Sequence, residues 1–111
     1  MSATLVYMTA GSVEEARSIG ASLVERRLAA CVNILPGMLS QYRWEGSIQT
    51  DEEVVLIAKT RSDLVASLTG HVQEIHSYDC PCVVALPIDG GNPAFLQWIE
   101  EETAEASGAK G

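Results

Sequence analysis

Basic residues, aromatic residues and long apolar runs are all scarce in this 111-residue sequence. Seven lysines and arginines stand against 15 aspartates and glutamates, which gives a formal net charge of -8 at pH 7. Such a surface repels phosphate backbones and anionic lipids, so we expect neither nucleic acid nor a membrane as a partner. The acidity favours solubility, and it is also compatible with the attraction of cations.

Signals for secretion or membrane insertion are not recognisable in the sequence. Residues 1–10 lack a basic segment followed by an apolar stretch and a cleavage site, and every apolar run is much shorter than a membrane span. The three cysteines form an odd set, and two of them are too close in sequence to bridge each other easily. We therefore expect a protein of the reducing cytoplasm.

The motifs of common enzyme classes are missing as well. The sequence has no Gly-x-Ser-x-Gly elbow, no phosphate-binding glycine loop and no His-Glu-x-x-His. The segment 90–92, Gly-Gly-Asn, precedes a predicted helix, and the start of that helix is enough to explain it. Because no motif requires catalysis, we do not expect an enzyme.

Apolar periodicity predicts one mixed domain. Runs of apolar and β-branched residues predict strands, which cover residues 5–8, 29–34, 39–44, 54–59 and 83–88. Helical spacing predicts helices that start with Ser12, Ser62 and Asn92 as caps. The order β-α-β-β-α-β with an added C-terminal helix is that of a ferredoxin-like α+β sandwich. We expect a single domain over 1–103 and a flexible tail over 104–111.

The second and third predicted strands form a hairpin that is long for a four-stranded sheet. Pro36-Gly37 predicts a bulge or bend in its first strand, and the polar stretch 46–51 predicts its turn. Exposed strand edges pair readily with another chain, and aromatic residues are enriched at such contacts. We therefore expect a homo-oligomer built through this hairpin, with Tyr42 and Trp44 as anchors. The alternative is a hairpin that bends back over its own sheet.

Residues 28–37, Leu-Ala-Ala-Cys-Val-Asn-Ile-Leu-Pro-Gly, resemble the signature of the CutA divalent-cation tolerance family. The resemblance continues in residues 44–46, Trp-Glu-Gly, and in residues 76–81, His-Ser-Tyr-Asp-Cys-Pro, and it covers about residues 5–98. It implies a cytoplasmic homotrimer with a ferredoxin-like subunit, in which the long hairpins pack against neighbouring subunits. It also implies a role in tolerance of divalent metals, with copper as the usual ion.

Two other functions are compatible with the same resemblance. The trimers of this family are similar in shape to the PII signalling proteins, which suggests a sensor or scaffold that holds a small molecule between subunits. The matches to the family at Glu45, Lys59, Tyr78 and Asp79 favour that alternative, because these residues could line a cleft in a trimer. The last alternative is a structural trimer without a specific metal site.

The copper ligands that the resemblance implies are only partly present. They are a cysteine late in the first strand and a histidine pair, and the corresponding residues here are Met8 and Ile75-His76. Only His76 matches directly, whereas the thioether of Met8 suits Cu(I). The structural alternatives are a histidine that bonds the carbonyls at a helix C-terminus and a methionine that packs in the core.

The motif Cys80-Pro81-Cys82 is the second candidate for metal binding. Side chains two residues apart in an extended segment face the same side, so both thiols could reach one soft ion. Alternatively, both cysteines are small apolar fillers at the start of a strand, which is also the role expected of Cys31. The predicted metal site thus contains His76, Cys82, Cys80 and Met8, and the predicted ion is copper or another divalent cation.

Overall fold

The computed structural model describes residues 2–105. The strands are β1 (Ala3–Ala10), β2 (Cys31–Trp44), β3 (Ser47–Arg61) and β4 (Val83–Pro87). The helices are α1 (Val13–Glu25), α2 (Val65–Ile75) and α3 (Pro93–Glu102), with a short 3-10 turn, η1 (Ser62–Leu64), before α2. The strands pair antiparallel in the order β2-β3-β1-β4, so the predicted ferredoxin-like α+β fold is confirmed. Of the predicted tail over 104–111, residues 106–111 lie outside the described residues.

Local capping signals explain two of the three helix starts. The side chains of Ser12 and Asn92 each accept a hydrogen bond of 3.1 Å from a backbone N–H in the first turn, as predicted. The predicted cap at Ser62 is wrong. Its hydroxyl lies 2.5 Å from Thr4 Oγ1 and donates to the carbonyl of Ser2 (3.2 Å), so it ties α2 to the start of β1 instead.

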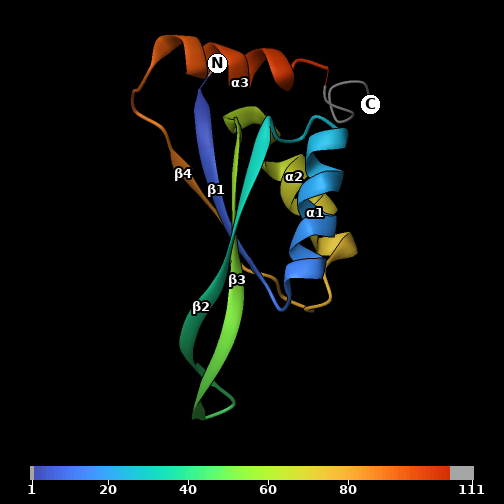
Figure 1. Ribbon diagram of the computed structural model, residues 1–111, viewed down its shortest axis with the longest axis vertical. Coiled ribbons are helices and arrows are strands. Elements are labelled where there is room, and N and C mark those ends of the chain that lie inside the picture. Colours follow the sequence, from blue (N-terminus) through green and yellow to red (C-terminus); the bar gives the residue numbers. More distant parts are fainter. Residues whose placement is uncertain (1, 106–111) are drawn as a thin grey trace.

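The hairpin of β2 and β3 extends well beyond the rest of the sheet (Figure 1). Its ladder shifts register between Leu35 and Met38, which confirms the predicted bulge. The turn is shorter than predicted, because Glu45 and Gly46 alone connect the strands, with φ of 50° and 85°. Residues 47–53, all polar except Ile48, belong to β3. A two-stranded ribbon with both faces in water accepts polar side chains on either face, which is why their polarity did not indicate a strand.

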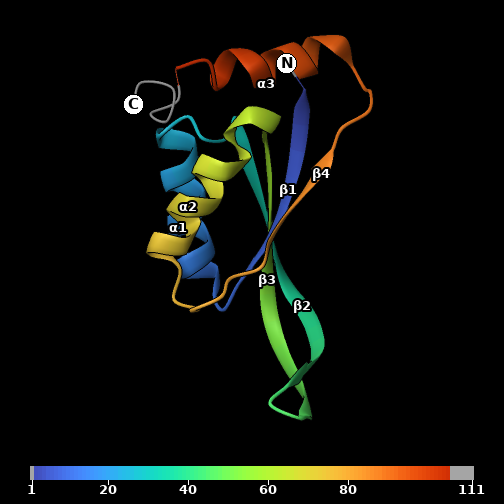
Figure 2. The same ribbon diagram turned by 180° about the vertical axis from the view of Figure 1, so that it is seen from behind.

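The helices α1 and α2 lie side by side on one face of the sheet, as both views show (Figures 1 and 2). The core between them contains Val6, Met8 and Leu56 from the sheet, and Leu23 and Leu68 from the helices, all at most 1% exposed. Because side chains alternate along a strand, the helices cover the even-numbered residues of β1. Each of these large side chains contributes roughly 1.5–3 kcal/mol through burial.

The opposite face of the sheet, here called the open face, is apolar and partly exposed. Leu5 and Tyr7 of β1 are half-buried there, and their ladder partners Leu86 and Val84 on β4 are each 50% exposed. In this single chain, the first strand is therefore fully buried only on the face that the helices cover. An apolar surface of this kind is typical of a contact with another molecule.

The helix α3 crosses the end of the sheet opposite the hairpin tip (Figure 2). It buries Ile99 but leaves Phe95 and Trp98 43% and 37% exposed, with ring centroids 5.4 Å apart. Within residues 2–105, the helices are all too short or too polar to cross a membrane.

A buried histidine joins the two helices that cover the sheet. His71 on α2 is 9% exposed, and its Nε2 lies 2.7 Å from Ser22 Oγ on α1. Burial lowers the pKa of His71, the charge of Arg26 lowers it further, and Glu74 opposes part of this effect. As the pH falls, the unfolded chain therefore takes up a proton at this histidine before the folded chain does.

We expect this difference to make the fold less stable in mild acid. The free energy of unfolding should be highest above about pH 6.5, the ordinary imidazole pKa, and should fall as the pH drops from there toward the lower pKa of the folded state. Urea unfolding of the wild type and of His71→Gln at several pH values measures this. The variant should show a flatter profile between about pH 7 and pH 5. If the free energy of unfolding of His71→Gln fell as steeply with pH as that of the wild type, groups other than His71 would cause the loss of stability in acid.

Candidate functional site

A pocket of about 470 Å³ lies where the loop between α2 and β4 meets the hairpin. We call it the thiol pocket, and it is lined by Thr9, Tyr42, Trp44, Glu53, Tyr78, Asp79, Cys80 and Cys82. It therefore brings the two neighbouring cysteines of the sequence motif together with both predicted aromatic anchors.

His76 holds the loop that forms one wall of this pocket. Its side chain is 1% exposed, its Nε2 lies 2.8 Å from the carbonyl oxygen of Thr9, and its Nδ1 accepts a hydrogen bond of 3.0 Å from the Tyr78 N–H. Because a carbonyl can only accept, these partners assign the proton to Nε2 of a neutral ring. Both ring nitrogens are occupied within the protein, so His76 would have to break one of these bonds to bind a metal ion.

A carboxylate from α1 supports the same loop. Glu15 accepts hydrogen bonds from the N–H and the hydroxyl of Ser77, at 2.7 Å and 2.9 Å, and it lies 3.5 Å from His76 Nδ1. Burial acts to raise the pKa of Glu15, but the hydrogen bonds from Ser77 oppose it, and the pKa is lowered overall. The Glu15 carboxylate thus fastens the loop to the first turn of α1.

Two tyrosine–carboxylate pairs stabilise the hairpin side of the pocket. The Tyr78 hydroxyl donates to Glu53 (2.8 Å), and the Tyr42 hydroxyl donates to Asp51. Burial, together with the bond to Glu53, raises the pKa of Tyr78 to about 12. The bond to Asp51 is the main cause of a raised pKa at Tyr42. Both phenols therefore remain protonated donors near neutral pH, and the Tyr78 pair connects the loop to β3.

The cysteines of the pocket are free thiols. Cys80 and Cys82 are both exposed, and the third cysteine, Cys31, lies in β2 and does not line the pocket. The pKa of the Cys82 thiol is raised, mainly because the thiol is partly buried and also because of the charge of Glu53. A metal ion that binds there must therefore displace a thiol proton.

The structure places the four predicted metal ligands in different surroundings. Cys80 and Cys82 share the thiol pocket, whereas Met8 is 1% exposed in the core beneath α1 and α2. His76 is buried with both nitrogens bonded. Among residues 2–105, no three histidine, cysteine, aspartate or glutamate side chains are arranged to hold one metal ion. The four residues therefore do not form one site within a single chain.

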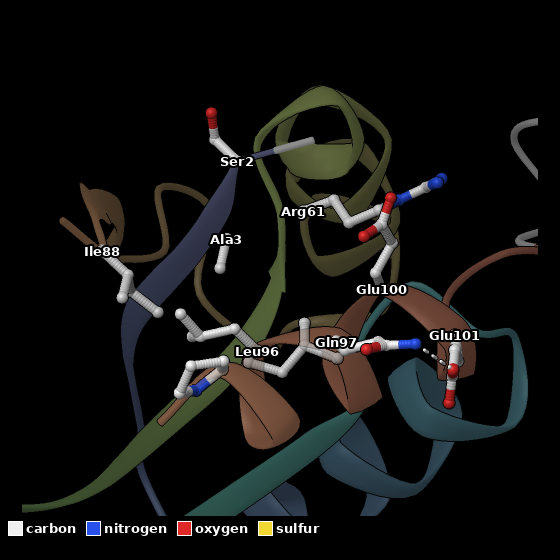
Figure 3. Close-up of a pocket in the computed structure, with 10 residues that line it drawn as sticks. Ser2, Ala3, Arg61, Ile88, Leu96, Gln97, Glu100 and Glu101 are labelled. Atoms are coloured by element: carbon white, nitrogen blue, oxygen red, sulfur yellow. Dashed lines mark hydrogen bonds between the residues drawn. The ribbon is translucent and has the colours of Figure 1, made fainter. Parts of the chain in front are cut away.

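A larger pocket, of about 630 Å³, lies at the other end of the molecule between α3 and the start of β1 (Figure 3). Two of its polar side chains lie close to a group of opposite polarity within the chain, although the buried Nε of Arg61 has no hydrogen-bond partner among the described residues. Gln97 donates to Glu101 at 3.0 Å, and the Nε of Arg61 lies 3.4 Å from an Asp63 carboxylate oxygen. None of the predicted site residues lines this pocket, so the thiol pocket remains the candidate site.

Comparison with known proteins adds independent information about the family of this fold. Residues 4–102 match the family model of the CutA1 divalent ion tolerance protein. The chain is 48% identical over 102 residues to Protein CutA 1, chloroplastic, of Oryza sativa subsp. japonica, and the alignment covers 92% of this chain and 58% of the rice protein. It is 46% identical over 99 residues to the divalent-cation tolerance protein CutA of Thermus thermophilus, covering 89% of this chain and 96% of that protein.

Solved structures give the same result. The crystal structure of CutA1 from Oryza sativa matches with a TM-score of 0.92 at 46% identity, covering 96% of this chain and 97% of that chain. This chain thus spans little more than half of the full rice chloroplastic protein, at 58%, but nearly all of the Thermus protein, at 96%. The matched region runs from β1 to α3 and contains the hairpin and the thiol pocket. The chain belongs to the CutA1 divalent ion tolerance protein family.

Proposed function

We propose that this chain works as a cytoplasmic homotrimer that binds copper or a related metal ion as part of divalent-cation tolerance. The observation that carries the proposal is the thiol pocket, where Cys80 and Cys82 face one hollow beside the hairpin. The description of the family supports the tolerance role, and the thiol ligands favour a soft metal such as copper. Three free cysteines support a reducing compartment.

Exposed apolar side chains support the homotrimer. Leu39, Trp44 and Ile48 on the hairpin are 70%, 59% and 66% exposed, and Leu86 on the open face is 50% exposed. In an isolated subunit these side chains remain in water. Their full burial against neighbouring copies would contribute about 1.5–3 kcal/mol for each large side chain. A PII-like assembly through the hairpin and the open face provides that burial.

A small molecule in the thiol pocket is the second candidate. Trp44 and Tyr42 offer aromatic surfaces beside the carboxylate of Glu53, a combination that suits a ligand with apolar and polar parts. In a metal-free thermal-shift screen of the wild type, such a ligand would raise the Tm by mass action. A copper-dependent shift that is lost in Cys80→Ser/Cys82→Ser supports the metal proposal instead.

We expect Cys80→Ser/Cys82→Ser to lose most of the copper(I) affinity of the wild type, because hydroxyls are poor ligands for a soft cation. Competition with a chromogenic copper(I) chelator, in reduced protein, measures the affinity. The matched control is Cys31→Ser, which removes the cysteine outside the pocket and should bind copper(I) as the wild type does. Unchanged affinity in the double variant would contradict the proposed site and favour a structural trimer without a specific metal site.

A further inference from the structure

The pocket between α3 and the start of β1, here called the α3 pocket, has an apolar side and a polar side. Its volume of about 630 Å³ is that of a small-molecule site. Figure 3 shows Ile88 and Leu96 on one side of it, and Arg61 and Glu100 on the other. The apolar residues that line it are all aliphatic: Ala3, Ile88, Pro93, Leu96 and Ile99. A ligand that fills the pocket therefore combines an aliphatic body with polar groups at one end.

Arg61 is a largely buried cation whose pairing is incomplete. Its side chain is 12% exposed, and its Nε has no hydrogen-bond partner among the described residues. The nearest carboxylate, 3.4 Å from Nε, is that of Asp63, which is itself 50% exposed. A buried charge is stable only when it is paired and hydrogen-bonded, and the planar guanidinium matches a carboxylate. Arg61 is thus suited to bind a carboxylate group of a ligand.

Glu100 makes a simple anion a poor ligand for the same pocket. Its carboxylate lies on the side of Arg61, and the next residue, Glu101, also lines the pocket. Glu101 accepts a hydrogen bond from Gln97 at 3.0 Å. Two carboxylates repel a ligand that is only negative, whereas they attract one that also carries an ammonium group. The charges of the polar side therefore favour a zwitterion over an anion.

We propose that the α3 pocket binds an α-amino acid with a branched aliphatic side chain, such as leucine. The ligand's carboxylate pairs with Arg61, its ammonium group pairs with Glu100, and its side chain packs against Ile88 and Leu96. An α-amino acid carries both charges on one carbon, and the two complementary side chains lie on one side of the pocket. The site contains no thiol and lies at the opposite end of the molecule from the thiol pocket, so this inference does not depend on metal binding.

Isothermal titration calorimetry of reduced, metal-free wild-type protein tests the proposal with L-leucine and two analogues. The analogue 4-methylpentanoate lacks the ammonium group, and 3-methylbutylamine lacks the carboxylate. We expect leucine to bind, and each analogue to bind at least about tenfold more weakly, because each loses a charge-assisted hydrogen bond. If 4-methylpentanoate bound as tightly as leucine, the pairing with Glu100 would be wrong. If 3-methylbutylamine did so, the pairing with Arg61 would be wrong.

Substitutions on both sides of the pocket locate the ligand. Arg61→Gln should bind leucine about as weakly as the wild type binds 3-methylbutylamine, and Glu100→Gln should weaken leucine without weakening 4-methylpentanoate. Leu96→Trp changes no charge but fills the pocket, so it should abolish leucine binding in a protein that still unfolds cooperatively. The matched control, Arg17→Gln, removes an exposed arginine of α1 and should bind leucine as the wild type does.

Two results would overturn the proposal as a whole. The first is a folded wild-type protein that does not bind leucine. The second is leucine binding that persists unchanged in Arg61→Gln, Glu100→Gln and Leu96→Trp, because the ligand would then lie outside the α3 pocket. Neither result bears on copper binding at Cys80 and Cys82, which is measured separately.

Discussion

Replacement of His76 by alanine is expected to lower the free energy of unfolding by about 3 kcal/mol. The ring is 1% exposed, so its removal leaves a cavity. It also leaves the carbonyl of Thr9 and the N–H of Tyr78 without their partner. Urea unfolding measures the change, at matched subunit concentrations so that the proposed trimer would contribute equally to both measurements.

The control for this variant is Gln73→Ala, an exposed position on α2 close to the same loop. A surface substitution of this kind should change stability by less than about 0.5 kcal/mol. The alternative is that His76 serves as a metal ligand, as the sequence predicted. A His76→Ala protein of unchanged stability that has lost its copper(I) affinity would contradict the structural role and restore the ligand prediction.

Replacement of Leu86 by aspartate is expected to dissociate the assembly. Leu86 is 50% exposed in the single chain, so a carboxylate at this position keeps much of its hydration in a free subunit. In a trimer that covers the open face, the same carboxylate is buried without a partner, which costs several kcal/mol at each of the equivalent contacts. Size-exclusion chromatography with light scattering should give a trimer mass for the wild type and a monomer mass for the variant.

The matched control is Val24→Asp, which places the same charge on α1. Val24 is 42% exposed, close to the value for Leu86, but it lies on the helical side of the molecule. This variant should remain a trimer. If Leu86→Asp also remained a trimer, the open face would not be the interface. If both variants dissociated, the effect would be general destabilisation.

Much of the fold could be predicted because the patterns that define it are local. The apolar run of β1 and the helical spacing in α1 can be recognised within a few residues, and the caps at Ser12 and Asn92 act within one helical turn. The prediction failed where a local pattern had two explanations. Most of residues 47–51 are polar and fit the turn predicted over 46–51, but they pair as a strand in an exposed ribbon. Ser62 resembles a cap, but it bonds to β1 instead.

The candidate site could be predicted only in part. The spacing of Cys80 and Cys82 is visible in the sequence, and the structure places both thiols in one pocket. The partner of His76 is a carbonyl 67 residues away, and the partner of Tyr78 is a carboxylate 25 residues away. No local pattern encodes such contacts. The burial of Met8 depended on which face of β1 the helices cover, and the alternation alone does not decide that.

The most direct test of the proposed copper-binding trimer is native mass spectrometry of the reduced wild-type protein with copper(I), because one spectrum gives both the subunit number and the metal count. We expect a trimer that carries one copper per subunit, and a trimer without copper for Cys80→Ser/Cys82→Ser. A monomer at micromolar concentration would contradict the assembly. A trimer whose copper count is the same in the double variant would contradict the metal site.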